Sequence, residues 1–255
     1  MKKKAFKAES KRLLDLMINS IYTHKEIFLR EIISNASDAC DKLCYQALTD
    51  DSVKLTRKDF KIDLSVNKDA RTITVTDNGI GMDKEDLENN LGVIASSGSY
   101  KFKQEVGDDT KDTDVIGQFG VGFYSSFMVS KKVEIRTRSY REGAQAVMWS
   151  CDGSPEYTME NIDKADRGTD IVLFIDDENK NFLETSEIET LLKKYCRFLP
   201  IPVVFGKEQE WKDGKYVDTD KEKVINDTTP AWTKKPTELN DEDYRKFYHE
   251  LYPTM

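Results

Sequence analysis

Three short segments of this 255-residue chain carry residue types suited to binding a phosphorylated ligand. The first places two carboxylates and a carboxamide at helical spacing, as Glu31, Asn35 and Asp38. The second is Asp77-Asn-Gly-Ile-Gly-Met82, and the third is Gly117-Gln-Phe-Gly-Val-Gly-Phe123. A helix-borne acid, an Asp before paired glycines and a glycine-rich loop, in this order, together predict an ATP site.

The first segment falls in a run from Lys25 to Leu48 that contains no Gly or Pro, so we place it on a helical wheel. One side is apolar and wide enough to be a core face; it contains Leu29, Ile32, Ile33, Ala36, Ala39, Cys40 and Leu43. The opposite side is a narrow polar stripe of Glu31, Asn35, Asp38 and Lys42. The wheel alone leaves open whether this stripe faces solvent or a cleft, and the other two segments favour the cleft.

Asp77 follows Thr72-Ile-Thr-Val-Thr76, an alternating pattern that predicts a half-buried strand. The glycines after it allow the backbone to come close to a ligand. A carboxylate at a strand end can accept a hydrogen bond from the amino group of adenine, and it would disfavour guanine, which carries an oxygen there. Taken alone, Asp-Asn-Gly is also typical of a plain turn.

The third segment has glycines at 117, 120 and 122 and continues into an apolar stretch without helix breakers. This pattern predicts a glycine-rich loop that opens a helix. The free N–H groups of such a junction, with the positive end of the helix dipole, can hold a phosphate. The segment is not a Walker A loop, because no Gly-Lys-Ser/Thr follows, and its spacing differs from the dinucleotide fingerprint.

These segments resemble the nucleotide-binding motifs of the ninety-kilodalton heat-shock chaperones, and they are most similar to the bacterial type of that family. The resemblance covers nearly the whole chain, and Arg167-Gly168-Thr169 is similar to the family's fourth motif. Gyrases, mismatch-repair ATPases and sensor histidine kinases share the wider superfamily, but the first and third segments are more particular to the chaperones. One departure is Ser96, where many relatives carry Lys, so no charged contact to phosphate is predicted from that position.

The resemblance implies a role for each site residue. Glu31 is expected to be the general base that activates water, and Asn35 to bind Mg²⁺ through its side-chain oxygen. Asp77 and Thr169 are expected to read the adenine. The other implied nucleotide-binding residues are Asp38, Lys42, Met82, Asn90, Gly117, Gln118, Phe119, Gly120, Val121, Gly122 and Phe123. For Met82 and Phe123, core packing is a serious alternative.

The function implied by the resemblance is slow ATP hydrolysis by the N-terminal domain of a molecular chaperone. Nucleotide would close a lid at about 90–120 and promote N-terminal dimerisation. The implied ligands are ATP or ADP with Mg²⁺, and the implied partners are unfolded or partly folded clients and a second copy of the full-length protein. Because the family's middle-domain Arg lies beyond this chain, we expect weak turnover. The family's dimerising C-terminal domain lies beyond it as well, so we expect a monomer or weak dimer. Two alternatives stay open: the ATPase head of a DNA-repair or topoisomerase machine, and a nucleotide-binding module without turnover.

Composition indicates a soluble globular protein, with 34% charged and 38% hydrophobic residues. The net charge of -8, from 39 Lys and Arg against 47 Asp and Glu, argues against nucleic acid as a partner, for which a basic surface is expected. No apolar run is long enough to span a membrane, and charged residues interrupt any signal-like region near the N-terminus. We therefore expect a cytoplasmic protein.

The predicted fold class is α+β, a two-layer sandwich whose mixed or antiparallel sheet is covered on one face by helices; the family has the Bergerat-type ATP-binding fold. Predicted helices lie at 10–22, 25–48, 187–198 and 241–251, and predicted strands at 61–66, 72–76, 132–138, 145–150, 155–159, 169–175 and 202–205. We divide the chain into an ATP-binding domain at 1–206, a charged linker with a short hairpin at 207–229, and the start of a middle domain at 230–255.

Overall fold

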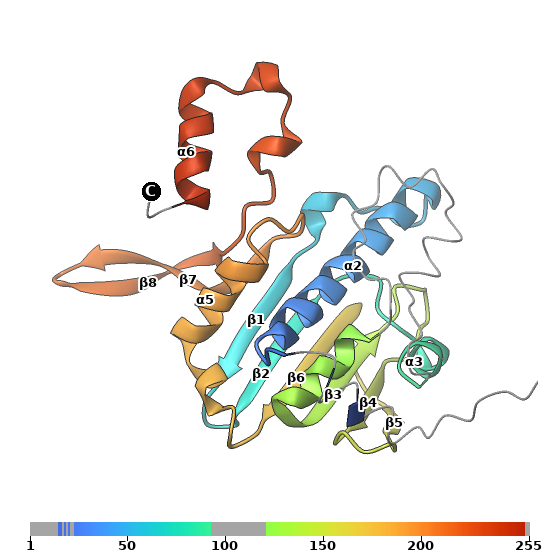
Figure 1. The fold of residues 1–255 in the computed structure, drawn as a ribbon. Helices are drawn as coiled ribbons and strands as arrows, with labels where there is room; N and C mark the ends of the chain where they lie inside the picture. The colour runs from blue at the N-terminus through green and yellow to red at the C-terminus, as the bar shows by residue number, and fades with distance from the viewer. Residues whose placement is uncertain (1–14, 17, 19, 21–22, 93–120, 253–255) are drawn as a thin grey trace, which may run out of the picture.

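The computed structural model of this protein describes residues 15–16, 18, 20, 23–92 and 121–252 (Figure 1). Its α-helices are α2 (Ile27–Thr49), α3 (Lys84–Asn90), α5 (Thr185–Tyr195) and α6 (Asp241–Leu251), and a 3₁₀ helix, η3, covers Gly122–Met128. Its strands are β1 (Ile62–Asn67), β2 (Thr72–Asp77), β3 (Ser130–Arg138), β4 (Val147–Cys151), β5 (Thr158–Asn161), β6 (Gly168–Ile175), β7 (Val203–Lys212) and β8 (Lys215–Val224). Most of the helix predicted at 10–22 lies outside the described residues.

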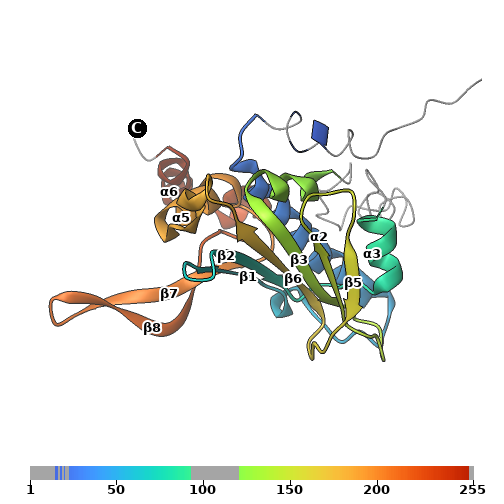
Figure 2. The same ribbon diagram turned by 90° about the horizontal axis from the view of Figure 1, so that it is seen from below.

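The eight strands form one sheet in the order β5-β4-β3-β6-β2-β1-β7-β8. Neighbouring strands are antiparallel except β1 and β7, which are parallel. Helices α2 and α5 lie on one face of this sheet, as Figures 1 and 2 show from two directions. The predicted α+β sandwich, with a mixed sheet covered on one face by helices, is confirmed.

Helix α2 packs on the sheet with the apolar side that the wheel predicts. Its buried residues include Leu29, Ile32, Ile33, Cys40 and Leu43. They join residues of β2 and β6, such as Ile73 and Leu173, in one hydrophobic core. Burying a Leu or Ile side chain stabilises a fold by about 1.5–3 kcal/mol, so this face determines the rotation of the helix. The direction of the polar stripe follows from that rotation.

The helix predicted after the glycine-rich loop is the 3₁₀ helix η3. Side-chain hydroxyls within and just after it bond to backbone carbonyls: Ser125 Oγ donates to Gly122 O at 2.6 Å, and Ser126 Oγ to Phe123 O at 2.7 Å. Ser130 Oγ donates to Ser126 O at 2.5 Å. These bonds offer the carbonyls an alternative to regular helical partners, which is why serines favour the tighter helix here.

Strands β7 and β8 form a longer hairpin than the short one predicted between 207 and 229. Each strand has ten residues, and β7 crosses the predicted boundary between 206 and 207. The turn at Asp213 and Gly214 has φ values of 52° and 82°, as two-residue hairpin turns require. Only the first three residues of β7 are buried. Because neither face of the hairpin beyond them is apolar, the sequence shows no alternation that would have revealed its length.

The C-terminal segment packs on the body of the protein through aromatic rings. Phe198, just after α5, lies 4.7 Å from Trp232 and 5.9 Å from Phe247 between ring centroids. Helix α6 begins at an Asn240 cap, whose side chain accepts the N–H groups of Glu242 and Asp243. Its assignment as the start of a middle domain stays a prediction. Within the described part of the chain, none of the helices combines the length and apolarity needed to cross a membrane.

Candidate nucleotide-binding site

The Lys42 end of the polar stripe of α2 lies near the end of β2 and the start of α3. Asp38 is buried and Lys42 is half-buried. Burial lowers the pKa of Lys42, because a charged amine is costly to remove from water, while the carboxylates of Asp38, Asp77 and Asp86 act to raise it. These acids belong to α2, β2 and α3. The Asp38 and Lys42 part of the stripe therefore lies near acidic residues of three elements, and its facing a cleft stays a prediction.

Glu31 lies against the first residue of η3. A Cβ added to Gly122 would lie 2.3 Å from Glu31 Oε2, so a side chain at this position would displace the Glu31 carboxylate. Arg30 donates to the other carboxylate oxygen, Oε1, from Nε at 3.0 Å and from Nη2 at 2.5 Å. This pair could not be predicted from helical spacing, because consecutive helical residues do not normally face each other. Asn35, one turn further along α2, is exposed.

Asp77 is a buried carboxylate at the end of β2. It is 4% exposed, and its Oδ1 accepts the N–H of Gly79 at 2.9 Å. Burial raises the pKa of Asp77 to about 7, against the opposing effect of backbone hydrogen bonds from Gly79 and Thr169. In the register of β2 and β6, Asp77 lies directly opposite Thr169. Buried carboxylates require hydrogen-bond donors, so the Asp77 carboxylate is suited to accept a hydrogen bond from an amino group of a ligand.

The glycine that follows two residues later packs the Asp77 turn against α2. A Cβ at Gly79 would lie 2.5 Å from the carbonyl carbon of Ala39, and the N–H of Ile80 donates to Ala39 O at 3.0 Å. From the sequence, the two glycines are expected to allow close approach of a ligand. In the structure Gly79 allows close approach of the turn to α2, which holds Asp77 in place beside the polar stripe, and close approach of a ligand stays a prediction.

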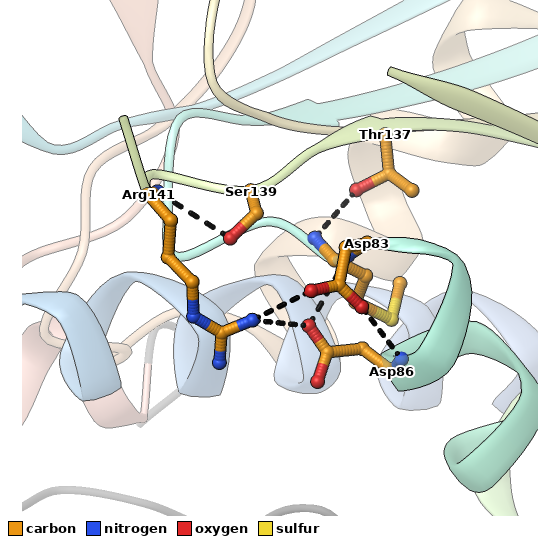
Figure 3. A network of polar contacts seen from close by, with 6 residues as sticks. Asp83, Asp86, Thr137, Ser139 and Arg141 are labelled. Carbon is orange, nitrogen blue, oxygen red and sulfur yellow. Dashed lines mark hydrogen bonds and ion pairs between the residues drawn. The ribbon is translucent and has the colours of Figure 1, made fainter. Parts of the chain in front are cut away.

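Thr137 connects two of the predicted site residues, although nothing in its sequence context singled it out. Its side chain is fully buried on β3, and Oγ1 accepts the N–H of Met82 at 2.9 Å (Figure 3). The same atom lies 2.9 Å from Thr169 Oγ1. A lone Thr in a β-rich run carries no signal of its own. Only the pairing of β3 with β6, which sets Thr137 opposite Thr169, reveals the connection.

Helix α3 is attached to the end of the sheet by an ion-pair network. Asp83 caps the helix and forms a capping box with Asp86, with bonds of 2.9 and 3.1 Å. Arg141, in the turn after β3, donates from Nη1 to Asp83 at 2.7 Å and to Asp86 at 3.2 Å (Figure 3). The half-buried Asn90 is the last residue of this helix.

Phe123 packs among aromatic rings of the core. It is buried, and its ring centroid lies 5.7 Å from that of Tyr124, 6.1 Å from that of Phe127 and 5.6 Å from that of Trp149. These edge-to-face contacts are typical of core aromatics. They favour the packing interpretation, which was the alternative for this residue.

Part of the predicted site lies outside the described residues. This applies to Gly117, Gln118, Phe119 and Gly120, to Ser96, and to residues 93–120 of the lid predicted at about 90–120. Val121 and Gly122, which end the glycine-rich segment, are described and lie half-buried at the start of η3.

Comparison with known proteins agrees with this geometry. A family model of histidine kinase-, DNA gyrase B- and HSP90-like ATPases matches residues 22–169, which is more than half of the chain and extends from α2 to Thr169. The chain therefore belongs to this family of ATPases, as the motifs predicted.

Individual relatives narrow the comparison further. The chain is 57% identical over 233 residues to the chaperone protein HtpG of Bacteroides fragilis, an alignment that covers 91% of this chain and 34% of that protein. It is 53% identical over 253 residues to HtpG of Porphyromonas gingivalis, covering 99% of this chain and 36% of that protein. With HtpG of Bacillus velezensis it shares 48% identity over 262 residues, covering 99% and 41%. The chain thus spans well under half the length of these relatives.

Proposed function

We propose that this chain is the adenine-nucleotide-binding domain of a chaperone similar to HtpG, and that it hydrolyses ATP slowly. The observation that carries the proposal is the position of Asp77, a buried carboxylate opposite Thr169 and beside the polar stripe of α2. The family membership and the chaperone relatives support it. The relatives favour a chaperone over the DNA-repair or topoisomerase alternative, a choice that the family description leaves open.

In this proposal Asp77 accepts a hydrogen bond from the adenine amino group. Guanine has an oxygen at that position, so its binding would leave two acceptors facing each other in a buried site. Thr169, opposite Asp77, contacts the same edge of the base. The stripe of α2 then extends from the base toward the phosphates, with Lys42 and Asp38 nearer to Asp77, and Asn35 and Glu31 farther along.

A magnesium ion would be held largely by the nucleotide itself. The described residues contain no group of three or more His, Cys, Asp and Glu side chains that could hold a metal ion. Asn35 is an exposed carboxamide one helical turn from Glu31, and its neutral oxygen suits Mg²⁺, which commonly keeps waters and phosphate oxygens as its other ligands. When bound, the ion would neutralise phosphate charge during phosphoryl transfer.

Glu31 is the proposed general base for hydrolysis. Arg30 occupies Oε1, whereas Oε2 faces Gly122 and the end of the glycine-rich loop that we expect to hold phosphate. A water between this carboxylate and the terminal phosphate would give up its proton to Glu31 as it attacks. Glu31 also distinguishes this site from a binding module without turnover.

Further properties of the whole protein are inferred from the family. We infer that nucleotide closes a lid at about 90–120 and promotes N-terminal dimerisation, and that unfolded or partly folded proteins are the clients. A cytoplasmic location and the domain boundaries at 206 and 229 belong to the same proposal.

Isothermal titration of the chain with ADP, ATP and GTP in the presence of Mg²⁺ tests the binding proposal. Adenine nucleotides should bind and GTP should not. Asp77→Asn removes a charged acceptor and should weaken ADP binding by about 10- to 100-fold. Asp218→Asn, on the exposed hairpin, is the matched control and should bind ADP like the parent. Equal binding of GTP, or full ADP affinity in Asp77→Asn, would contradict the adenine assignment.

Phosphate release by the full-length protein tests the role of Glu31. Glu31→Gln should keep nucleotide affinity and lower the turnover rate by about 10²-fold or more, because positioned general bases contribute about 10²–10⁴. Glu85→Gln, at an exposed position on α3, is the control. A Glu31→Gln protein with normal turnover would assign proton removal to another group.

A further inference from the structure

We propose that Thr137 is a positioning residue for adenine recognition, whose hydroxyl directs the hydroxyl of Thr169 toward the base. The inference rests on the proposed function, since it needs an adenine nucleotide at Asp77 and Thr169. Thr137 belongs to none of the motif segments and does not itself touch the nucleotide in this arrangement.

The sheet places three polar side chains in one row across three strands. Thr137 on β3 lies opposite Thr169 on β6, and Thr169 lies opposite Asp77 on β2. Directly opposite residues of antiparallel strands point to the same face of a sheet. All three are buried, with exposures of 0%, 5% and 4%. Thr137 is therefore the third member of a buried polar row. The other two members, Thr169 and Asp77, are the residues proposed to bind the adenine base.

The hydrogen bonds of Thr137 limit what Thr169 can do. A Thr hydroxyl has one proton and two lone pairs, and one lone pair of Thr137 Oγ1 accepts the N–H of Met82 at 2.9 Å (Figure 3). Its proton can go to Thr169 Oγ1 at 2.9 Å or to Gly168 O at 3.2 Å. If the proton goes to Gly168, Thr169 donates back to Thr137 and presents only lone pairs to a ligand. If it goes to Thr169, the proton of Thr169 is available to the ligand.

Adenine distinguishes these two patterns. Next to its amino group, which Asp77 would accept, the base has an unprotonated ring nitrogen, N1, which needs a donor. Only the pattern in which Thr137 donates to Thr169 supplies that donor, and the contact to Thr169 is the shorter of the two. Successive hydroxyl donors also polarise one another in a buried site. Thr137 thus sets the direction of the Thr169 hydroxyl and, through Met82, holds the segment that follows Asp77.

The test compares ADP with 1-deaza-ADP, in which N1 is replaced by a C–H group, by titration calorimetry. The parent protein should bind ADP about tenfold more tightly than the analogue, the size expected for one hydrogen bond. In Thr137→Val this ratio should fall below about threefold, because the Thr169 hydroxyl is no longer directed. Thr137→Ser keeps the hydroxyl and should keep the ratio. Thr137→Ala removes the same hydroxyl and replaces Thr137→Val if that variant does not fold.

A second analogue separates this role from a general loss of structure. The diphosphate of purine riboside lacks the amino group whose hydrogen bond Asp77 would accept. The ratio of ADP affinity to the affinity for this analogue should therefore be the same in the parent and in Thr137→Val. Each ratio is taken within one protein, so partial unfolding changes neither. An N1 ratio that is unchanged or larger in Thr137→Val would overturn the inference while leaving the proposed function intact. Failure of the parent to bind ADP would overturn the proposed function as well.

Discussion

The sheet contains two regions of opposite character. At the ends of β2, β3 and β6, Asp77, Thr137 and Thr169 form a buried polar row. At the tip of β7 and β8, Trp211 and Tyr216 form an aromatic cross-strand pair with centroids 4.9 Å apart, and they are 64% and 67% exposed. Both regions use paired strands and glycines with positive φ. Strand pairing is therefore common to both regions. Only the first region is buried, and burial there raises the pKa of the Asp77 carboxyl group.

Glycine has a different function in each region. Gly168 has a φ of 104°, and a Cβ there would lie 2.1 Å from the carbonyl oxygen of Asp77. Gly214 has a φ of 82°, and a Cβ there would meet no atom within 4 Å. Both positions disfavour an L side chain. Only at Gly168 does the surrounding structure also leave no room for one, because another strand lies against it.

The largest expected effect on the free energy of unfolding therefore comes from replacing Gly168, with the replacement of Gly214 as the comparison. Gly168→Ala should lower the free energy of unfolding by about 3–5 kcal/mol, since backbone must move as well as accept strain. Gly214→Ala should cost about 1–2 kcal/mol, from backbone strain alone. Urea denaturation of the two variants measures the difference. Equal losses would mean that the contact with Asp77 adds nothing.

The second-largest expected effect is a pH dependence of the free energy of unfolding, caused by Asp77 in the buried region. Burial raises the pKa of Asp77 to about 7 from 3.8, so the ligand-free folded state holds this proton more tightly than the unfolded state. The resulting stabilisation is complete below the unfolded pKa and is lost as the pH rises through about 7. Relative to Asp77→Asn, the parent should lose about 2–3 kcal/mol of unfolding free energy between pH 5 and pH 8. The exposed Asp218→Asn should follow the parent at each pH.

Nucleotide binding should depend on pH in the opposite sense. An adenine amino group stabilises the ionised carboxylate, so ADP should lower the pKa of Asp77 and release a proton on binding. Affinity should then increase by up to about tenfold between pH 6 and pH 8, and Asp77→Asn should remove the dependence. Titrations in buffers of different ionisation enthalpy measure the proton release. An affinity that falls as the pH rises would show that the neutral carboxyl group is the form that binds.

A smaller effect is expected at the exposed end of the sheet. Trp211→Ala removes the aromatic contact with Tyr216, and such pairs contribute about 0.5–1.5 kcal/mol. Because this part of the hairpin adds no residue to the core, the loss should increase amide hydrogen exchange in β8 and leave ADP affinity unchanged. A change in ADP affinity would connect the two regions that the comparison separates.

The smallest effect is expected for the ion pairs that attach α3. Arg141 contacts Asp83 and Asp86, but its side chain is 56% exposed, so water and salt weaken both pairs. Arg141→Ala should cost less than about 1 kcal/mol of unfolding free energy, and the difference should shrink at high salt. Thermal unfolding at low and high salt measures it. A large, salt-independent loss would show that Arg141 acts through packing.

Much of the site could be predicted because its residues are close in sequence or have typical local patterns. Helical spacing placed Glu31, Asn35 and Lys42 on one stripe, and alternation placed Asp77 at a strand end. The pairings of Glu31 with Arg30 and of Thr137 with Thr169 could not be predicted in this way. The first depends on the rotamers of neighbouring side chains, and the second joins strands that are far apart in the chain.

The sequence by itself determined the fold class, the core face of α2 and the membership in an ATPase family, because periodicity and motif spacing are local properties of the chain. The tertiary structure alone decided that Asp77 is buried, that Gly79 packs closely against α2, and that Thr137 lies opposite Thr169 on the neighbouring strand. It also decided the length of the β7 and β8 hairpin. Burial and cross-strand register depend on contacts between distant segments, and no single segment contains the information that specifies them.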